Sequence, residues 1–136
     1  MSGDKPFFDT NILLYLLSDD ELKADKAEEL LAAGGAVSVQ VLNEFASIAT
    51  RKLSMPIAEV HEVLNTVRAI CRVDPLTIEV HEQGLDIAER YRFSPCDAMI
   101  VASAFLGKCP TLYSEDLQHR QRIDEQLTIV NPFEAN

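Results

Sequence analysis

The segment Pro6–Leu13, PFFDTNIL, contains the transition that decides the fold. Its apolar run, residues 6–8, is short and stops at a charged residue, Asp9, which is typical of a buried strand. From Asn11 to Leu17 the apolar residues follow helical spacing. The segment therefore predicts a short strand that passes almost directly into a helix.

The same alternation of strand and helix continues along the chain. Four further strands are predicted at 36–39, 71–73, 111–113 and 127–130. Helical spacing predicts helices at 21–33, 40–53, 55–70, 77–91 and 94–106, and a short helix or turn is expected before the last strand. We therefore expect a three-layer α/β/α fold with a central, mainly parallel sheet of about five short strands.

Several residues predict where the helices begin and end. Gly34-Gly35 and Gly107 are expected to end helices, because glycine is common just past a helix C-terminus. Thr77 is expected to cap a helix, and Ser94-Pro95 to start one with proline at its first position.

The composition fits one globular domain. The chain has 136 residues, of which 47% are hydrophobic and 25% charged, so we expect a single folded domain over residues 1–136 rather than a disordered protein. The formal net charge is −10, which argues against a protein that coats DNA or an anionic membrane. A nuclease remains compatible with this charge, since metal ions can supply positive charge where a phosphate binds.

The cysteines and the apolar segments indicate the compartment. Cys71, Cys96 and Cys109 are odd in number and form no CxxC pair, which disfavours a disulfide framework and favours a reducing cytoplasm. Residues 1–8 lack the pattern of a signal peptide, and no apolar run approaches the roughly 20 residues that span a bilayer. We expect a cytoplasmic protein without a membrane segment.

Four acids stand where the chemistry of a parallel sheet is expected. Asp9 and Asp116 follow predicted strands, while Glu44 and Asp97 lie in the first turns of predicted helices. Each has an ordinary structural explanation, because acids also cap helices and complement helix dipoles. If the strands are parallel, however, all four converge at one edge of the sheet. Several carboxylates in a small space need positive compensation, which Mg²⁺ or Mn²⁺ can provide.

Four motifs resemble those of one known family, and they lie in the family's order over nearly the whole chain. They are FFDTNIL at 7–13, VQVLNEF at 39–45, SPCDAMIVASA at 94–104 and LYSEDL at 112–117. Together they resemble the motifs of PIN domains, and the length of the chain resembles the VapC-type toxins of toxin–antitoxin pairs. The resemblance implies a PIN-like fold and metal-dependent hydrolysis of RNA.

The resemblance also assigns roles to residues. It implies that Asp9, Glu44, Asp97 and Asp116 are the catalytic metal ligands, with Glu115 as an alternative to Asp116. A further set of polar side chains would orient the carboxylates, water or a phosphate oxygen: Thr10, Asn11 and Ser114. The cofactor would be Mg²⁺ or Mn²⁺ and the partners RNA, an antitoxin protein and a second copy of the chain.

Other families place acids in similar positions. A phosphatase of the haloacid dehalogenase type also has an Asp after its first strand, but it expects a second Asp where Asn11 stands. A non-catalytic receiver domain expects a phosphoacceptor Asp after a central strand, for which only Asp74 is available. A PIN fold that only binds RNA remains a third alternative, because a fold does not establish an activity.

Overall fold

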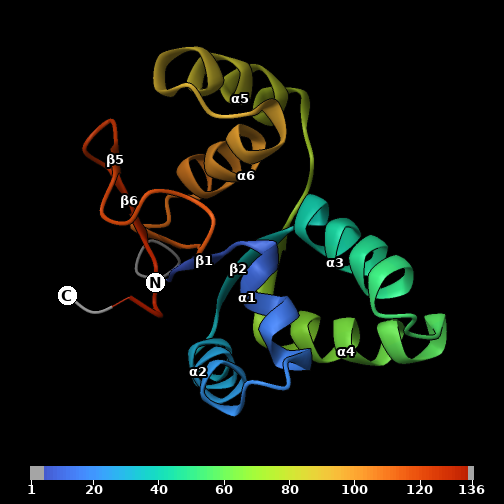
Figure 1. Cartoon of the computed structure of the whole chain (residues 1–136). Helices are drawn as coiled ribbons and strands as arrows, with labels where there is room; N and C mark the ends of the chain where they lie inside the picture. Colours follow the sequence, from blue (N-terminus) through green and yellow to red (C-terminus); the bar gives the residue numbers. More distant parts are fainter. Residues whose placement is uncertain (1–4, 135–136) are drawn as a thin grey trace.

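The computed structural model describes residues 5–134. Its strands are β1 (Phe7–Phe8), β2 (Gly35–Ser38), β3 (Cys71–Asp74), β4 (Thr111–Tyr113), β5 (Arg122–Ile123) and β6 (Leu127–Val130). Its α-helices are α1 (Thr10–Leu14), α2 (Glu21–Ala32), α3 (Val39–Lys52), α4 (Ile57–Ile70), α5 (Ile78–Tyr91) and α6 (Pro95–Leu106), with a 3-10 turn, η2 (Tyr15–Leu17), after α1. Figure 1 shows these elements in chain order.

The strands form one sheet in the order β3-β2-β1-β4-β6-β5. The first five are mutually parallel, and only β5 pairs antiparallel, with β6. β1 lies at the centre, with β2 on one side and β4 on the other, so the strand order reverses there. Ligands of open parallel sheets bind beyond the carboxyl ends of the strands at such a point. Asp9 is the residue that follows β1.

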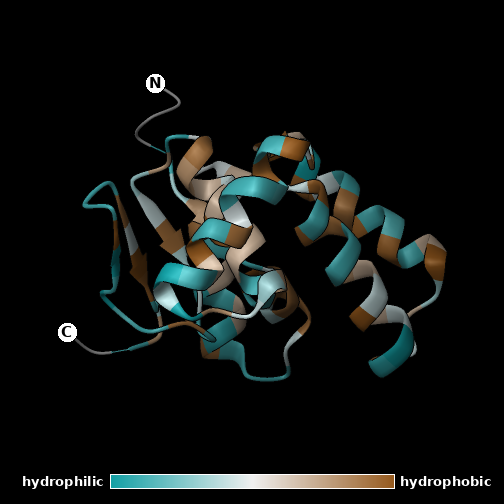
Figure 2. Ribbon diagram, turned by 90° about the horizontal axis from the view of Figure 1, so that it is seen from above, coloured by the Kyte–Doolittle hydropathy of each residue, from teal (hydrophilic) through white to brown (hydrophobic). Residues whose placement is uncertain are grey.

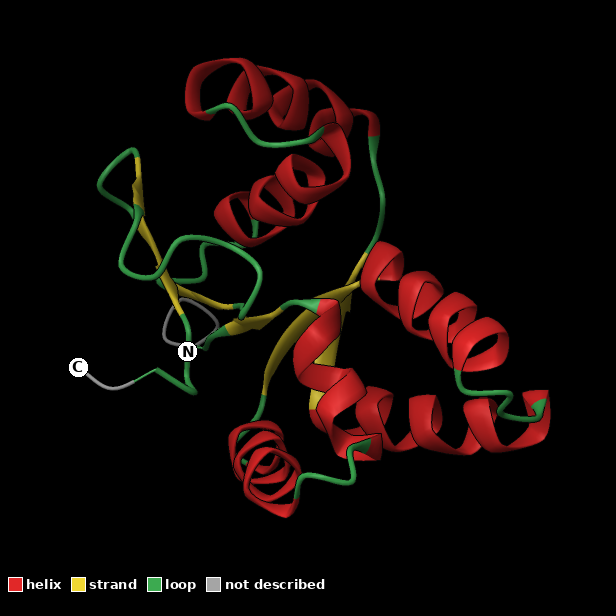
Figure 3. Ribbon diagram, viewed as in Figure 1, coloured by secondary structure: helices red, strands yellow, loops and turns green. Residues whose placement is uncertain are grey.

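Helices cover both sides of this sheet. α5 and α6 lie together on one side, and α1 to α4 lie on the other (Figures 1 and 3). The α/β fold with helices on both faces and a mainly parallel sheet is confirmed. In Figure 2 the helices show brown and teal segments in turn, as expected for helices with one face on an apolar core.

The predicted helix starts and stops are confirmed with small shifts. The Thr77 and Ser94 hydroxyls cap α5 and α6 by accepting the backbone N–H groups of Val80 and Asp97, and Gly107 ends α6. The expected end of the second helix at Gly34-Gly35 is partly wrong, because Gly35 is the first residue of β2. A Cβ at Gly35 would overlap the ring of Phe8 and approach the Pro6 carbonyl to 2.6 Å, so glycine lets β1 and β2 lie close together.

The sheet has six strands, one more than the five segments in which the sequence predicted strands. The segment expected as a short helix or turn contains β5, whose two residues pair with Thr128 and Leu127 of β6. The pattern could not indicate it, since Arg122 is exposed and only Ile123 is buried. Within residues 5–134, no helix is long and apolar enough to cross a membrane. The start of the chain used in the signal-peptide argument, residues 1–4, lies outside the described part.

Candidate metal centre

Asp9 is the most deeply placed of the four candidate acids. Its backbone N–H donates to the Tyr113 carbonyl at 3.0 Å, which fixes it between β1 and β4. One carboxylate oxygen accepts the Thr10 backbone N–H at 2.7 Å, so Asp9 also caps α1, and the other accepts the Ser114 hydroxyl at 2.7 Å. Only 5% of Asp9 is exposed. The residue is therefore held in a fixed orientation by the start of α1 and the end of β4.

Asn11 and Ser114 connect Asp9 to Asp116. The Asn11 amide donates to Asp9 Oδ2 at 3.4 Å and to Asp116 Oδ2 at 3.1 Å. The Ser114 hydroxyl, which donates to Asp9, also accepts the Asp116 backbone N–H at 3.2 Å. These two polar side chains, expected from sequence to orient carboxylates, do so between residues more than a hundred positions apart in the chain.

Glu44 lies on α3 and is held at both carboxylate oxygens. The Thr10 hydroxyl donates to Oε1 at 2.7 Å, and the side-chain amide of Gln40 donates to Oε2 at 3.2 Å. Thr10 belongs to α1 and follows Asp9 directly, so this contact ties the second acid to the first. The expected role of Thr10 in orienting a carboxylate matches this contact.

Asp97 comes from the opposite layer of helices. It lies in the first turn of α6, where its backbone N–H donates to the Ser94 hydroxyl at 3.2 Å. Most of α6 is buried, from Ala98 to Ala104 with only Met99 partly exposed, so the helix start is fixed in place. Asp97 is close enough to Asp9 for its charge to raise the pKa of the Asp9 carboxyl.

The pKa of the Asp9 carboxyl reflects both its burial and the neighbouring acids. Burial raises the pKa of the Asp9 carboxyl from 3.8 to about 6, against the hydrogen bonds from Ser114 and Thr10, which lower it. The negative charges of Asp116 and Asp97 raise this pKa further. Among the residues described, none of Asp9, Glu44, Asp97 and Asp116, here called the acid site, forms an ion pair with a lysine or arginine.

The acid site brings oxygen ligands to one end of the sheet without a preformed coordination shell. Within the described part of the chain, no three His, Cys, Asp or Glu side chains lie close enough to hold a metal ion as they stand. Hydroxyl and amide donors lie between the carboxylates instead. The donor chemistry nevertheless fits a hard divalent cation, because the four side chains offer carboxylate oxygens and no thiolate.

Glu115 is used differently from its neighbour Asp116. Its carboxylate accepts the Tyr15 hydroxyl and pairs with the Lys23 ammonium at 2.9 Å. These contacts keep the pKa of Glu115 below its ordinary value, the Tyr15 hydrogen bond being the largest cause. Its backbone N–H donates to Asn11 Oδ1 at 3.1 Å. Glu115 therefore anchors the loop, and Asp116 is the acid that shares Asn11 and Ser114 with Asp9.

Two functional contacts were missed by sequence reasoning. Gln40 contacts Glu44, and the spacing of four residues on one helix could have suggested it. The contacts of Glu115 with Tyr15 and Lys23 join residues 100 and 92 positions apart, and nothing in the sequence indicates them.

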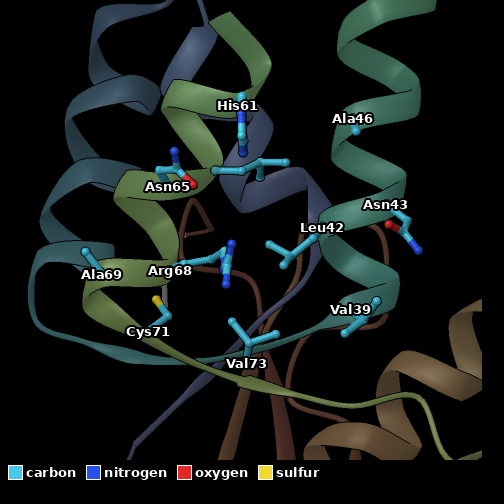
Figure 4. Close-up of a pocket in the computed structure, with 11 residues that line it drawn as sticks. Val39, Leu42, Asn43, Ala46, His61, Asn65, Arg68, Ala69, Cys71 and Val73 are labelled. Carbon is cyan, nitrogen blue, oxygen red and sulfur yellow. The ribbon is translucent and has the colours of Figure 1, made fainter. Parts of the chain in front are cut away.

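A separate hollow lies away from the acid site. Figure 4 shows this groove of about 800 Å³ between α3 and α4, lined mainly by apolar side chains, with Asn43, His61, Asn65 and Arg68 among them. None of the four acids lines it. This groove and the acid site are therefore different parts of the fold.

Comparison with known proteins agrees with the fold and with the order of the motifs. The family model described as the PIN domain matches residues 7–124. The chain belongs to the PIN domain family. This membership replaces the haloacid dehalogenase and receiver alternatives.

Two solved structures similar to this PIN domain are described as a toxin and as a toxin–antitoxin complex. The VapC20 toxin of Mycobacterium tuberculosis, described as cleaving the sarcin-ricin loop, aligns over 82% of this chain and 89% of its own, with a TM-score of 0.67 and 20% identity. A toxin–antitoxin complex from Klebsiella pneumoniae aligns over 96% and 99%, with a TM-score of 0.67 and 23% identity.

VapBC2 of Rickettsia felis, bound to a DNA fragment from its promoter, aligns over 93% of this chain and 98% of its own, with a TM-score of 0.66 and 18% identity. These likenesses establish the shared fold. Among curated protein sequences, none matches this chain.

Proposed function

We propose that residues 1–136 form one metal-dependent endoribonuclease domain that hydrolyses RNA phosphodiester bonds, and that the protein is the cytoplasmic toxin of a toxin–antitoxin pair. The charge balance around Asp9 carries the proposal. A carboxyl group with a pKa of about 6 lies near the charges of Asp97 and Asp116, and no basic side chain among residues 5–134 pairs with these acids. A divalent cation would relieve this repulsion.

The ligands we propose for that cation are Asp9, Glu44, Asp97 and Asp116. When bound, Mg²⁺ or Mn²⁺ supplies positive charge for the phosphate and lowers the pKa of water for hydrolysis. Thr10 and Gln40 orient Glu44, while Asn11 and Ser114 orient Asp9 and Asp116. No protein nucleophile is required, and a carboxylate of the site would accept the proton of the attacking water.

Cleavage of RNA by the purified chain tests the proposal. Single-stranded and structured RNA would be incubated with the protein in Mg²⁺, in Mn²⁺ or in EDTA. We expect internal cleavage with either metal and none in EDTA. Cleavage that persists in EDTA would contradict metal dependence, and an inactive protein that binds no divalent ion by calorimetry would remove the nuclease proposal.

The partners are proposed from the similar structures. The Klebsiella pneumoniae neighbour is a toxin–antitoxin complex, and the Rickettsia felis VapBC2 complex is bound to promoter DNA. A net charge of −10 would favour a basic antitoxin segment. We also propose that the chain forms a homodimer. A neighbouring reading frame for a small DNA-binding protein, and co-purification of its product with this chain, would support the pairing.

A further inference from the structure

Gln40 connects two elements that each contribute to the acid site. It is half-buried in the first turn of α3, one helical turn before Glu44. Its side-chain nitrogen donates to Glu44 Oε2 at 3.2 Å and to the backbone carbonyl of Cys96 at 2.9 Å. Cys96 precedes Asp97 in the first turn of α6. One amide group therefore contacts the carboxylate of one acid and the backbone beside another.

The contact spans the end of the sheet. α3 follows β2 on one side, and α6 lies with α5 on the other (Figure 1). Residues 40 and 96 are 56 positions apart, so the hydrogen bond from Gln40 to Cys96 is a tertiary contact between two helices. A contact between neighbours on one helix would stabilise only that helix. The bond to Cys96 instead fixes the start of α6 relative to α3.

The second N–H of the amide completes the orientation of Glu44. Thr10 holds Oε1 from α1 and Gln40 holds Oε2 from α3. Without the amide, the carboxylate would be held at one oxygen only and could rotate about that bond. Two donors from different elements therefore fix the plane of the carboxylate.

An amide is the side chain whose chemistry suits this position. It donates to one oxygen of Glu44 and to the Cys96 carbonyl oxygen without adding charge. A lysine or arginine here would neutralise Glu44 and compete with a bound cation, whereas a carboxylate would repel both Glu44 and the Cys96 carbonyl. The geometry therefore favours a neutral donor beside an acid whose charge is kept for another partner.

We propose that Gln40 is a positioning residue, which holds Glu44 and the first turn of α6 at a fixed separation and thereby sets the affinity of the acid site for a divalent ion. This inference rests on the proposed function, because it assumes that Glu44 and Asp97 bind the ion. Polar partners that orient metal ligands typically contribute a factor of about 10–100 to metal affinity.

Calorimetric titration of the full chain with Mn²⁺ measures the binding affinity and tests the inference. Gln40→Met removes both hydrogen bonds while keeping a side chain of similar length. Gln83→Met is the matched control. Gln83 lies on α5, and its side chain forms no hydrogen bond with any residue that the structure describes. We expect Gln40→Met to weaken Mn²⁺ binding about 10–100-fold and Gln83→Met to leave it unchanged. The thermal unfolding midpoint without metal should change little in either variant.

The outcomes separate the two proposals. If the unaltered chain binds no Mn²⁺, the metal-dependent function itself is wrong. If the unaltered chain binds Mn²⁺ and Gln40→Met binds it equally well, only the role of Gln40 is wrong. The role of Gln40 would also be wrong if Gln40→Met lost as much free energy of unfolding without metal as it lost free energy of Mn²⁺ binding. Gln40 would then have a purely structural role. Gln40→Asn, whose amide is one methylene too short to span both acceptors, provides a second variant with the same expected loss.

Discussion

Two groups of carboxylates in this molecule have opposite surroundings. Asp124, beside β5, accepts two hydrogen bonds from Arg90 at 2.7 and 3.0 Å, and Asp86 pairs with the same guanidinium at 2.9 Å. These bonds lower the pKa of Asp124, with Arg90 as the largest cause. In the acid site, burial and neighbouring acids raise the pKa of Asp9 to about 6 instead.

The difference shows which negative charges the fold itself neutralises. Arg90 pairs with both Asp86 and Asp124, and Lys23 pairs with Glu115, all within the described chain. The acid site receives only neutral donors: hydroxyls, amides and backbone N–H groups. Such donors orient carboxylates but leave their charge for something outside the chain.

The largest expected effect tests this contrast directly. We expect Asp97→Asn to lower the rate of RNA cleavage by more than about 100-fold, because it removes one charged ligand from the site. The matched variant Asp124→Asn removes a carboxylate paired with Arg90, so it should keep full metal-dependent activity and lower the unfolding midpoint by at most a few degrees. Cleavage assays and circular dichroism of both variants provide the comparison. Full activity in Asp97→Asn would remove that residue from the site.

A second prediction concerns stability without metal. Because the pKa of Asp9 is higher in the folded protein than its ordinary value of 3.8, the folded state binds more protons between about pH 4 and 6. The free energy of unfolding should therefore fall as the pH rises through this window, by up to about 3 kcal/mol from this group. Denaturant unfolding in EDTA across this range would measure it.

Asp9→Asn keeps the shape of the side chain and removes the charge. We expect this variant to lose the fall in stability between pH 4 and 6, and to lose the stabilisation that Mn²⁺ gives to the unaltered chain at neutral pH. An unchanged pH profile in Asp9→Asn would show that another group titrates in this window.

The smallest effect sharpens the choice between adjacent acids. Asp116→Asn should weaken Mn²⁺ binding strongly, whereas Glu115→Gln should weaken it less than about tenfold, because Glu115 acts only by anchoring the loop through Tyr15 and Lys23. Calorimetric titration of both variants measures this. The reverse order of affinities would make Glu115 the fourth ligand.

Local features of the chain made much of the fold predictable. Short apolar runs indicated five of the six strands, and the hydroxyls of Thr77 and Ser94 marked helix starts. β5 was not predictable, since its two residues become a strand only by pairing with β6. Gly35 was expected to end a helix, but it is the first residue of β2, where a Cβ would overlap the ring of Phe8 in the neighbouring strand.

The positions of the candidate acids in the fold were predictable, but their contacts were not. The positions of Asp9 and Asp116 after strands, and of Asp97 at a helix start, follow from the alternation of elements. The interleaved hydrogen bonds of Asn11 and Ser114 depend on how far apart β1 and β4 place their side chains. The anchoring of Glu115 by Lys23 depends on the position of α2, which no sequence pattern specifies.

The two edge strands of the sheet have a consequence for solubility. One edge strand is β3, which has four residues, and its Arg72 and Asp74 form an ion pair at 2.8 Å. The other edge strand is β5, which has only two residues. Short, charged border strands are poor templates for adding a strand from another molecule. We therefore expect this chain to resist amyloid-like stacking, so that any association between copies would use helical surfaces.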